Sequence, residues 1–312
     1  MGRFLARRLI QSALLLWAIM TFTFALVHLT PGGPESKLIE NPRATEEMKQ
    51  RLRERYGLDQ PLHIQYLRWV GGALTFDFGR SYSYAARPVL DVIGERAWPT
   101  AQLGLLSYVI ALIGIPVGIY AAMHRGRLGD NLVRVLTVIG HSVPAWWLGL
   151  SIIVLMNSLI GWFPNGQGRG SPLEWLKHII VPALLLSIGG VITFSRYVRS
   201  EVLEVTGQDY IRTARAKGLP PATVTWRHIM RNALMPVVTI IGFLLPAVLG
   251  GALITETIFN WPGMGRLFFE AAISRDYPLL LGILSIGTFL TILGNLIADV
   301  LYGVVDPRIR YG

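Results

Sequence analysis

The sequence predicts an all-α protein that crosses a membrane six times and carries an external amphipathic segment between its first and second membrane-spanning helices. Of its 312 residues, 52% are hydrophobic and only 15% are charged, whereas soluble globular proteins have about 25% charged residues. Six apolar segments reach or approach the roughly 20 residues that a helix needs to cross a bilayer. A backbone inside hydrocarbon must satisfy its own hydrogen bonds, so these spans are predicted to be helices.

The predicted spans, in chain order, cover residues 9–29, 101–123, 135–155, 179–195, 233–254 and 279–298. The first has the length of a retained span and no small-residue cleavage site, which distinguishes it from a signal peptide. The fourth is the shortest and could extend at either end. We therefore divide the chain into a first span with its N-terminal residues (1–29), an external segment (30–99), a five-helix core (100–303) with a loop at 200–232, and a tail (304–312).

The external segment contains one clearly delimited helix. Thr45 is a good N-terminal cap, and Glu46 and Glu47 place acids in the first turn, where the helix dipole favours them. Gly57 stands where a left-handed residue ends a helix, and Pro61 blocks its continuation. Two interpretations remain open: a solvated helix, or a surface for a partner or substrate.

Glycine and proline recur inside the predicted spans. A proline inside a helix costs about 3 kcal/mol in water, but neighbouring helices in a membrane bundle can satisfy the freed carbonyls. Ordinary packing is the simpler interpretation, and the possible kink or gating positions are Pro116, Pro144, Pro236 and Pro246. Gly114 and Gly118 have the spacing that lets two helices approach closely.

The loop between the fourth and fifth spans predicts a short helix with a defined start and end. Asp209 is predicted as its N-cap, residues 210–217 as two turns, and Gly218 as its stop before Pro220 and Pro221. So short a helix is not stable alone, so we expect it to depend on docking. A second helical pattern, over residues 223–234, leads directly into the fifth span.

The residues of this short helix suit contact with a partner. Ala214, Ala216 and Gly218 are predicted to leave a small-residue surface, and Arg212, Arg215 and Lys217 offer charges to acidic groups or anionic lipid. A cytoplasmic protein partner is favoured, and a basic helix lying on lipid headgroups is the alternative. Nucleic-acid binding is disfavoured, because the basic run has one nearby Trp and lies between membrane spans.

The distribution of basic residues predicts the orientation of the chain. The side that holds both termini carries 15 Lys and Arg residues, whereas the two short loops opposite hold four. Basic loops remain in the cytoplasm, so both termini and the 200–232 loop are predicted to be cytoplasmic. The net charge of +10 therefore records orientation and does not indicate nucleic-acid binding.

The stretch from Asp209 to Leu219, DYIRTARAKGL, resembles the EAA coupling loop of binding-protein-dependent ABC transporter permeases, in the dipeptide, oligopeptide and nickel branch. Arg212, Thr213 and Ala214 take the positions of the Glu-Ala-Ala triplet, and Gly218 that of the glycine. Further motifs resemble the B-type permease subunit of this family in the same order: YGLDQPL at 56–62, FGRS at 78–81, RAWPT at 96–100, ETIFNWPGMG at 256–265 and DPR at 306–308.

The resemblance implies a non-catalytic pore subunit in a bacterial or archaeal cytoplasmic membrane. Its implied partners are a homologous second permease subunit, two cytoplasmic ABC ATPases, an external substrate-binding protein and the lipid bilayer. ATP and Mg²⁺ would bind to the ATPases, so no cofactor is expected on this chain. The implied ATPase-coupling residues are Asp209, Tyr210, Arg212, Thr213, Ala214, Arg215, Lys217 and Gly218. The implied cargo is a di- or oligopeptide, with nickel chelates and glutathione as alternatives.

Other functional classes find little support in the residues. None of the four lysines precedes Ser or Thr, which excludes a P-loop in this chain. The six histidines lack metal-ligand spacing, and the sequence has no cysteine. An ion-coupled secondary transporter is the alternative on physical grounds, but its spans would normally carry acidic or histidine residues, and the predicted spans here hold almost no acid.

Overall fold

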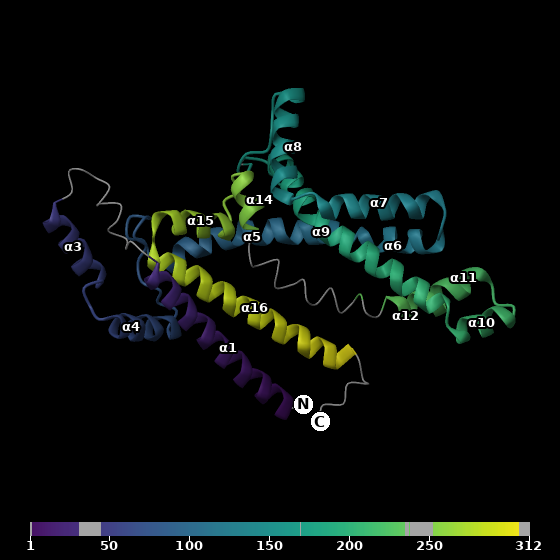
Figure 1. Cartoon of the computed structure of the whole chain (residues 1–312), viewed down its shortest axis with the longest axis horizontal. Coiled ribbons are helices and arrows are strands. Elements are labelled where there is room, and N and C mark those ends of the chain that lie inside the picture. The colour runs from purple at the N-terminus through teal and green to yellow at the C-terminus, as the bar shows by residue number, and fades with distance from the viewer. Residues whose placement is uncertain (1, 31–44, 169, 235–236, 238–251, 306–312) are drawn as a thin grey trace.

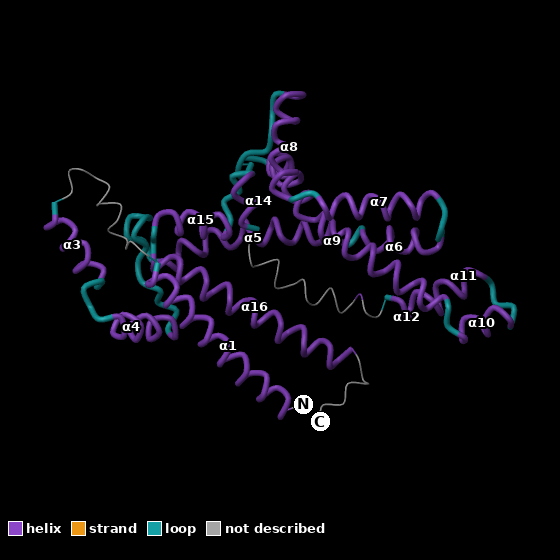
Figure 2. The backbone as a smooth tube through the Cα atoms, in the orientation of Figure 1, coloured by secondary structure: helices purple, strands orange, loops and turns teal. Residues whose placement is uncertain are grey.

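The structure is a computed structural model that describes residues 2–30, 45–168, 170–234, 237 and 252–305. Helices dominate this part of the chain, and no strand occurs within it (Figures 1 and 2). The elements are α1 (Gly2–Leu29), α3 (Glu46–Tyr56), α4 (Leu62–Leu74), α5 (Val89–Ala111), α6 (Gly114–Met123), α7 (Leu128–Ser142), α8 (Ala145–Ile160), α9 (Pro172–Thr206), α10 (Asp209–Ala216), α11 (Pro221–Thr223), the π-helix η1 (Val224–Met230), α12 (Arg231–Ala233), α14 (Leu253–Ile258), α15 (Met264–Ser274) and α16 (Tyr277–Val305).

Four stretches of the described chain are long and apolar enough to cross a membrane: Arg7–Leu29, Val89–Met123, Pro172–Thr206 and Tyr277–Ile297. They contain the first, second and fourth predicted spans and nearly all of the sixth. The fourth predicted span, the shortest from the sequence, lies inside a helix of 35 residues, so it extends at both ends. The second begins within a helix that starts at Val89, well before residue 101.

The third predicted span is wrong as a single straight helix. Residues 135–155 are divided between α7 and α8, whose axes differ by 97°. The break falls at Val143 and Pro144, both in extended conformation. Proline lacks an N–H donor and disfavours helical geometry in the residue before it, which ends α7 at Ser142. Together, α7 and α8 are long and apolar enough to cross a membrane, so they add a fifth span if the bent pair is counted as one broken span.

Most of the fifth predicted span, at 233–254, lies outside the described residues, as do Pro236 and Pro246. The described chain reaches Ala233 in α12 and resumes before α14. The structure therefore supports four or five spans by length and composition. The count of six stays a prediction.

Helix α9 is the centre of one packed layer, with α5, α6 and α7 against it. Gly114 and Gly118 make the close approach of α6 possible, as the sequence predicted. An added Cβ would lie 2.4 Å from the carbonyl oxygen of Val191 at Gly114 and 2.5 Å from that of Ser195 at Gly118. Pro116 lies in the first turn of α6, where a missing N–H leaves few intrahelical bonds unmade.

Helices α1 and α16 run side by side along one edge of the molecule (Figure 1). The N-terminal end of α1 and the C-terminal end of α16 lie at the same end of this pair, and α3 and α4 lie at its other end (Figure 1). The predicted caps of α3 are confirmed: the hydroxyl oxygen of Thr45 accepts from the N–H of Met48, and Gly57 is left-handed with φ 66°.

Three of the sequence motifs meet where α5, α14 and α15 come together. Glu256 is fully buried, and its carboxylate accepts from the hydroxyl of Thr100 at 2.9 Å and from the N–H of Arg266 at 2.9 Å. The indole of Trp261 donates to the carbonyl of Pro99 at 2.9 Å. Nearby, the buried Asp276 accepts from the hydroxyl of Ser81 at 2.5 Å. These buried carboxylates fix the loops between the helices.

Candidate coupling site

Helix α10 begins one residue before the predicted start. The N-cap is Gln208, in extended conformation with no side-chain cap bond, so the predicted capping role of Asp209 is wrong. Asp209 is the first helical residue, where its charge still favours the positive end of the helix dipole. Its carbonyl accepts from the hydroxyl of Thr213 at 3.0 Å. Arg212 forms an ion pair with Asp209 at 3.4 Å, but both side chains are largely exposed, so this pair adds little stability.

The predicted stop at Gly218 is present. Lys217 is the C-cap, and Gly218 has φ +72°, a conformation that residues with a Cβ rarely adopt. The N–H of Gly218 donates to the carbonyl of Arg215 at 3.0 Å. No atom lies within 4 Å of an added Cβ at Gly218, so the requirement for glycine is conformational and not steric. Pro220 and Pro221 then begin the next helix.

The inner face of α10 is packed against its own chain. Ile211 and Ala214 are buried in a cluster with residues of α9 and η1, among them Val198, Val202 and Val224. Ala214 was predicted to belong to an exposed small-residue surface, and it does not, because its side chain fills this core. The docking that so short a helix needs is therefore supplied within the chain.

The outer face of α10 is open. The exposed residues are Asp209, Tyr210, Arg212, Thr213, Arg215, Ala216, Lys217 and Gly218. The hydroxyl of Tyr210 accepts from the side-chain amide of Asn232 at 3.0 Å. Asn232 belongs to α12 (Arg231–Ala233), which reaches the first residue of the fifth predicted span. Tyr210 thus ties α10 to the start of that segment.

The helical pattern predicted over residues 223–234 is confirmed in outline, since helix continues from Pro221 to Ala233. Its centre is different in kind, because Val224–Met230 form a π-helix. Such segments are rare and often occur at functional sites. Amino-acid composition does not distinguish a π-helix from an α-helix, so the sequence predicted only a helix here.

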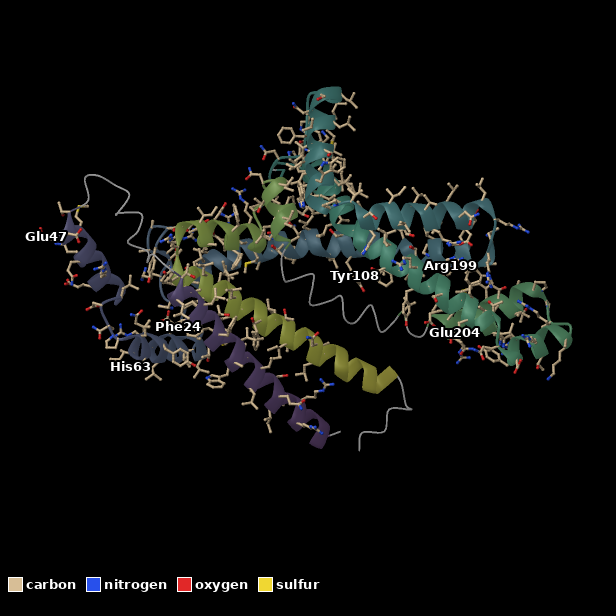
Figure 3. All side chains as sticks on the ribbon, viewed as in Figure 1. Phe24, Glu47, His63, Tyr108, Arg199 and Glu204 are labelled. Atoms are coloured by element: carbon tan, nitrogen blue, oxygen red, sulfur yellow. The ribbon has the colours of Figure 1, made fainter. Side chains whose placement is uncertain are left out.

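A further contact, which the sequence did not predict, joins α7 to α9 through Asp130 and Arg199. Figure 3 labels Arg199 on α9. Asp130 is 1% exposed. Its carboxylate accepts from Nε of Arg199 at 2.6 Å and from Nη2 at 2.8 Å, and it also accepts from the N–H of Gly126 at 3.0 Å. This two-point geometry matches the planar guanidinium to the carboxylate. The pair fixes the turn between α6 and α7 against the C-terminal half of α9.

The sequence profile of the family described as "Binding-protein-dependent transport system inner membrane component" matches residues 114–311, which include α10. A second profile, "Binding-prot-dependent transport system membrane comp, N-term", matches residues 1–101. The oligopeptide transport system permease protein AppB of Bacillus subtilis (strain 168) is 38% identical over the full length of both chains. The glutathione transport system permease protein GsiC of Salmonella paratyphi A (strain ATCC 9150 / SARB42) is 40% identical, covering 96% of this chain and 95% of GsiC.

Among solved structures, a chain of the MetNI methionine ABC transporter in an inward-facing conformation is similar, with a TM-score of 0.55 and 20% identity. The similarity covers 69% of this chain and 96% of that chain. At this identity it shows a shared fold.

Proposed function

Because the chain belongs to the family of binding-protein-dependent transport system inner membrane components, we propose that it is the membrane-spanning permease subunit of an ATP-driven importer of peptides. Relatives named as oligopeptide and glutathione permeases, each similar over nearly the whole chain, support a cargo of this kind. In this proposal the chain performs no chemistry. It forms part of the pathway, and partner ATPases bind ATP and Mg²⁺.

The observation that carries the proposal is the division of α10 into two faces. Ile211 and Ala214 hold the helix against α9 and η1, while Arg212, Arg215 and Lys217 remain exposed. Because the inner face is packed, a partner that binds the outer face and moves can move α10 without separating it from the rest of the chain. We propose that an ATPase subunit docks on the exposed face and that its acidic groups meet these three cations.

The geometry offers two paths for movement from α10 into the membrane. One path runs through the buried cluster that Ile211 shares with residues of η1 and α9. The other runs through Tyr210 and Asn232 to α12 and the fifth predicted span. Movement of the docked ATPases would then reach two spans at once, which suits alternating access.

The proposed assembly contains a homologous second permease, two ABC ATPases and an external substrate-binding protein in the cytoplasmic membrane. Both termini and α10 face the cytoplasm, and α3 and α4 face outside. The arrangement of the helix ends supports this orientation, because α3 and α4 lie at the end of the molecule opposite to α10 (Figure 1).

A single-cysteine crosslink tests the docking. The chain has no natural cysteine, so Arg215→Cys can be labelled with a photoactivatable maleimide in membranes that lack the ATPases. Purified ATPases are then added and illuminated. We expect an adduct at this position and none with the matched control Arg51→Cys, whose side chain on α3 is 75% exposed. An adduct at both positions, or at neither, would contradict docking on α10.

The energy source needs a separate test. We expect no peptide uptake by the purified chain alone in vesicles under a proton or sodium gradient. Gradient-driven uptake without ATPases would instead support an ion-coupled secondary transporter.

A further inference from the structure

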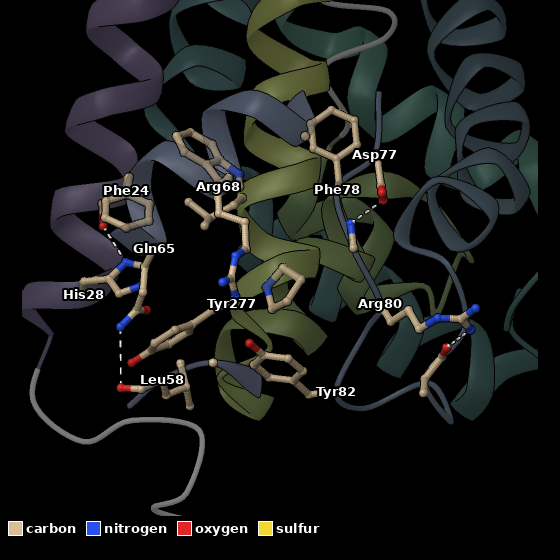
Figure 4. A pocket seen from close by; sticks show the side chains of 17 residues that line it. Phe24, His28, Leu58, Gln65, Arg68, Asp77, Phe78, Arg80, Tyr82 and Tyr277 are labelled. Carbon is tan, nitrogen blue, oxygen red and sulfur yellow. Dashed lines mark hydrogen bonds between the residues drawn. The ribbon is translucent and has the colours of Figure 1, made fainter. Parts of the chain in front are cut away.

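A cavity of about 460 Å³ is lined in part by α4, which lies at the end of the molecule opposite to α10 (Figure 1). Figure 4 shows this cavity from close by. It is open on one side and bordered by the last two turns of α1, by α4, by the loop that precedes α5 and by the start of α16. Aromatic side chains form much of its wall: Phe24, Trp69, Phe78, Tyr82 and Tyr277. This volume and an apolar wall with a few polar groups are typical of small-molecule sites.

Two side chains of this wall, Arg68 and Trp69, carry hydrogen-bond donors without an acceptor among the described residues. Arg68, on α4, lines the cavity and forms no hydrogen bond or ion pair with the residues that the structure describes. Its guanidinium points into the cavity toward Tyr82 and Tyr277 (Figure 4). The next residue, Trp69, has a buried indole N–H without a partner. The Arg68 side chain is exposed, so its donors are open to solvent and to a ligand in the cavity, whereas the Trp69 N–H is closed off from both.

The other polar groups of the wall are already engaged locally. Nε2 of Gln65 donates to the carbonyls of Leu58 and Gln60, at 3.4 and 2.7 Å. The ring of His28 stacks on that of Phe24, and its Nδ1 lies 2.9 Å from the Phe24 carbonyl oxygen. These contacts give His28 a packing role within its own helix. None of these groups supplies Arg68 or Trp69 with an acceptor. The cavity therefore offers donors to a ligand from outside.

Glycine at position 57 makes room for the Arg68 side chain. An added Cβ there would lie 3.1 Å from Nη1 of Arg68, and Gly57 also lines the cavity. The residue that ends α3 with a left-handed conformation thus also leaves space beside the guanidinium.

We propose that this cavity binds the carboxylate end of a peptide, with the Arg68 guanidinium donating to the carboxylate and the Trp69 ring forming part of the apolar wall. Guanidinium and carboxylate match in geometry and charge, and such hydrogen bonds are stronger than neutral ones. The aromatic wall receives the last side chain of the peptide. This inference rests on the proposed function and assigns a recognition site to its peptide cargo.

The wall carries charges of both signs, because it includes Arg80, which donates to the carbonyl of Ala86 at 2.8 Å, as well as Arg68 and Asp77. Asp77 also lines the cavity, and one of its carboxylate oxygens accepts from the N–H of Gly79 at 3.0 Å. A free peptide carries an ammonium as well as a carboxylate, so it can meet both Asp77 and Arg68. A headgroup with only negative charge would meet the arginines but offer no donor to Asp77.

Direct binding to the assembled transporter, without its binding protein, tests the site. The complex in phosphatidylcholine nanodiscs is titrated with radiolabelled Ala-Ala-Phe and with its C-terminal amide. We expect the free acid to bind at least tenfold more tightly than the amide. Arg68→Ala should weaken binding of the acid about 10- to 100-fold, as expected for loss of a charged hydrogen-bond donor, and leave the amide unchanged. Arg68→Lys should fall between these values.

Arg51→Ala is the matched control, because it removes an exposed arginine of α3 outside the cavity wall. It should bind both peptides like the unmodified chain. Equal affinity for acid and amide, or an Arg68→Ala variant that binds the acid normally, would overturn the proposal. So would loss of acid binding in nanodiscs that contain phosphatidylglycerol, since the anionic lipid would then occupy the site.

Peptide uptake driven by ATP is measured in parallel with the same complex. If uptake is normal but Arg68 does not affect the preference for the acid, the site is refuted and the proposed function stands. If the complex takes up no peptide, the proposed function itself fails.

Discussion

Removing the guanidinium from the Asp130–Arg199 pair should destabilise the protein and weaken the link between α7 and α9. In Arg199→Met the carboxylate of Asp130, 1% exposed, would lose both hydrogen bonds from Arg199 and keep only that from the N–H of Gly126. Breaking a buried pair in this way costs about 3–5 kcal/mol. The Arg199 side chain is 23% exposed, so we expect the lower end, about 3 kcal/mol.

Thermal unfolding of the purified transporter in detergent measures this loss. For a chain of 312 residues, about 3 kcal/mol corresponds to a fall in the unfolding midpoint of roughly 5 °C. Asp130→Asn should cost less, because Arg199 can still reach solvent. The double variant should be more stable than the sum of the single effects predicts, since it leaves no buried charge unpaired.

A functional measurement separates coupling from stability. We expect Arg199→Met to hydrolyse more ATP per peptide imported, since α9 would no longer carry α7 with it. Arg212→Met, which breaks the exposed pair on α10, is the stability control and should not change the midpoint. An Arg199→Met variant as stable as the unmodified chain, or strictly additive single and double variants, would refute the reasoning.

Three further predictions concern single positions. Gly218→Val should reduce the stimulated ATP hydrolysis of the assembled complex without affecting membrane insertion, because valine rarely adopts φ +72°. Gly218→Asn should retain more activity, and equal activity of the two variants would contradict a conformational cause. Gly118→Leu should lower the unfolding midpoint by several degrees, because an added Cβ would lie 2.5 Å from the carbonyl oxygen of Ser195; an unchanged midpoint would mean that α6 can shift freely. Burial, followed by the hydrogen bond that its hydroxyl donates to Glu270, raises the pKa of Tyr84 to about 12. Its neutral form therefore stabilises the fold below pH 10, and this contribution is lost as the pH rises from 10 through 12. In an ultraviolet titration, the unmodified chain should show one tyrosine that ionises near pH 12 and that is missing from the curve of Tyr84→Phe. If the missing tyrosine is instead one that ionises near pH 10, the result would count against the hydrogen bond.

The features that could be predicted from the sequence are those with local signals. Thr45 and Gly57 delimit α3 because capping depends on residues within one turn of the helix end. Gly218 is equally local. The start of α10 was misplaced by one residue because Asp209 is favourable both as an N-cap and in the first turn, and the local sequence does not separate these positions.

The features that could not be predicted depend on partners far apart in the chain. Asp130 and Arg199 are separated by 69 residues, and Thr100 and Glu256 by 156, so no spacing rule links them. The break at Val143 was not predicted for a different reason. The apolar run continues across it, and hydrophobicity alone favoured one span although Pro144 carried the opposite signal. The burial of Ala214 was missed because a small residue suits both a core and a surface.

The pairing of α1 with α16 has a consequence for the biosynthesis of the chain. Only 11% of the most apolar window of α1 is buried, and α16 is the helix that packs most extensively against it in the described part of the chain. Roughly 250 residues separate the two helices, which at typical rates of translation delays α16 by about 12–50 s. During that interval α1 must remain stable in lipid by its own hydrophobicity. A nascent chain released before α16 would leave Phe24 and Val27 without the Tyr277 and Leu281 contacts of their cluster, a surface that membrane quality control could recognise.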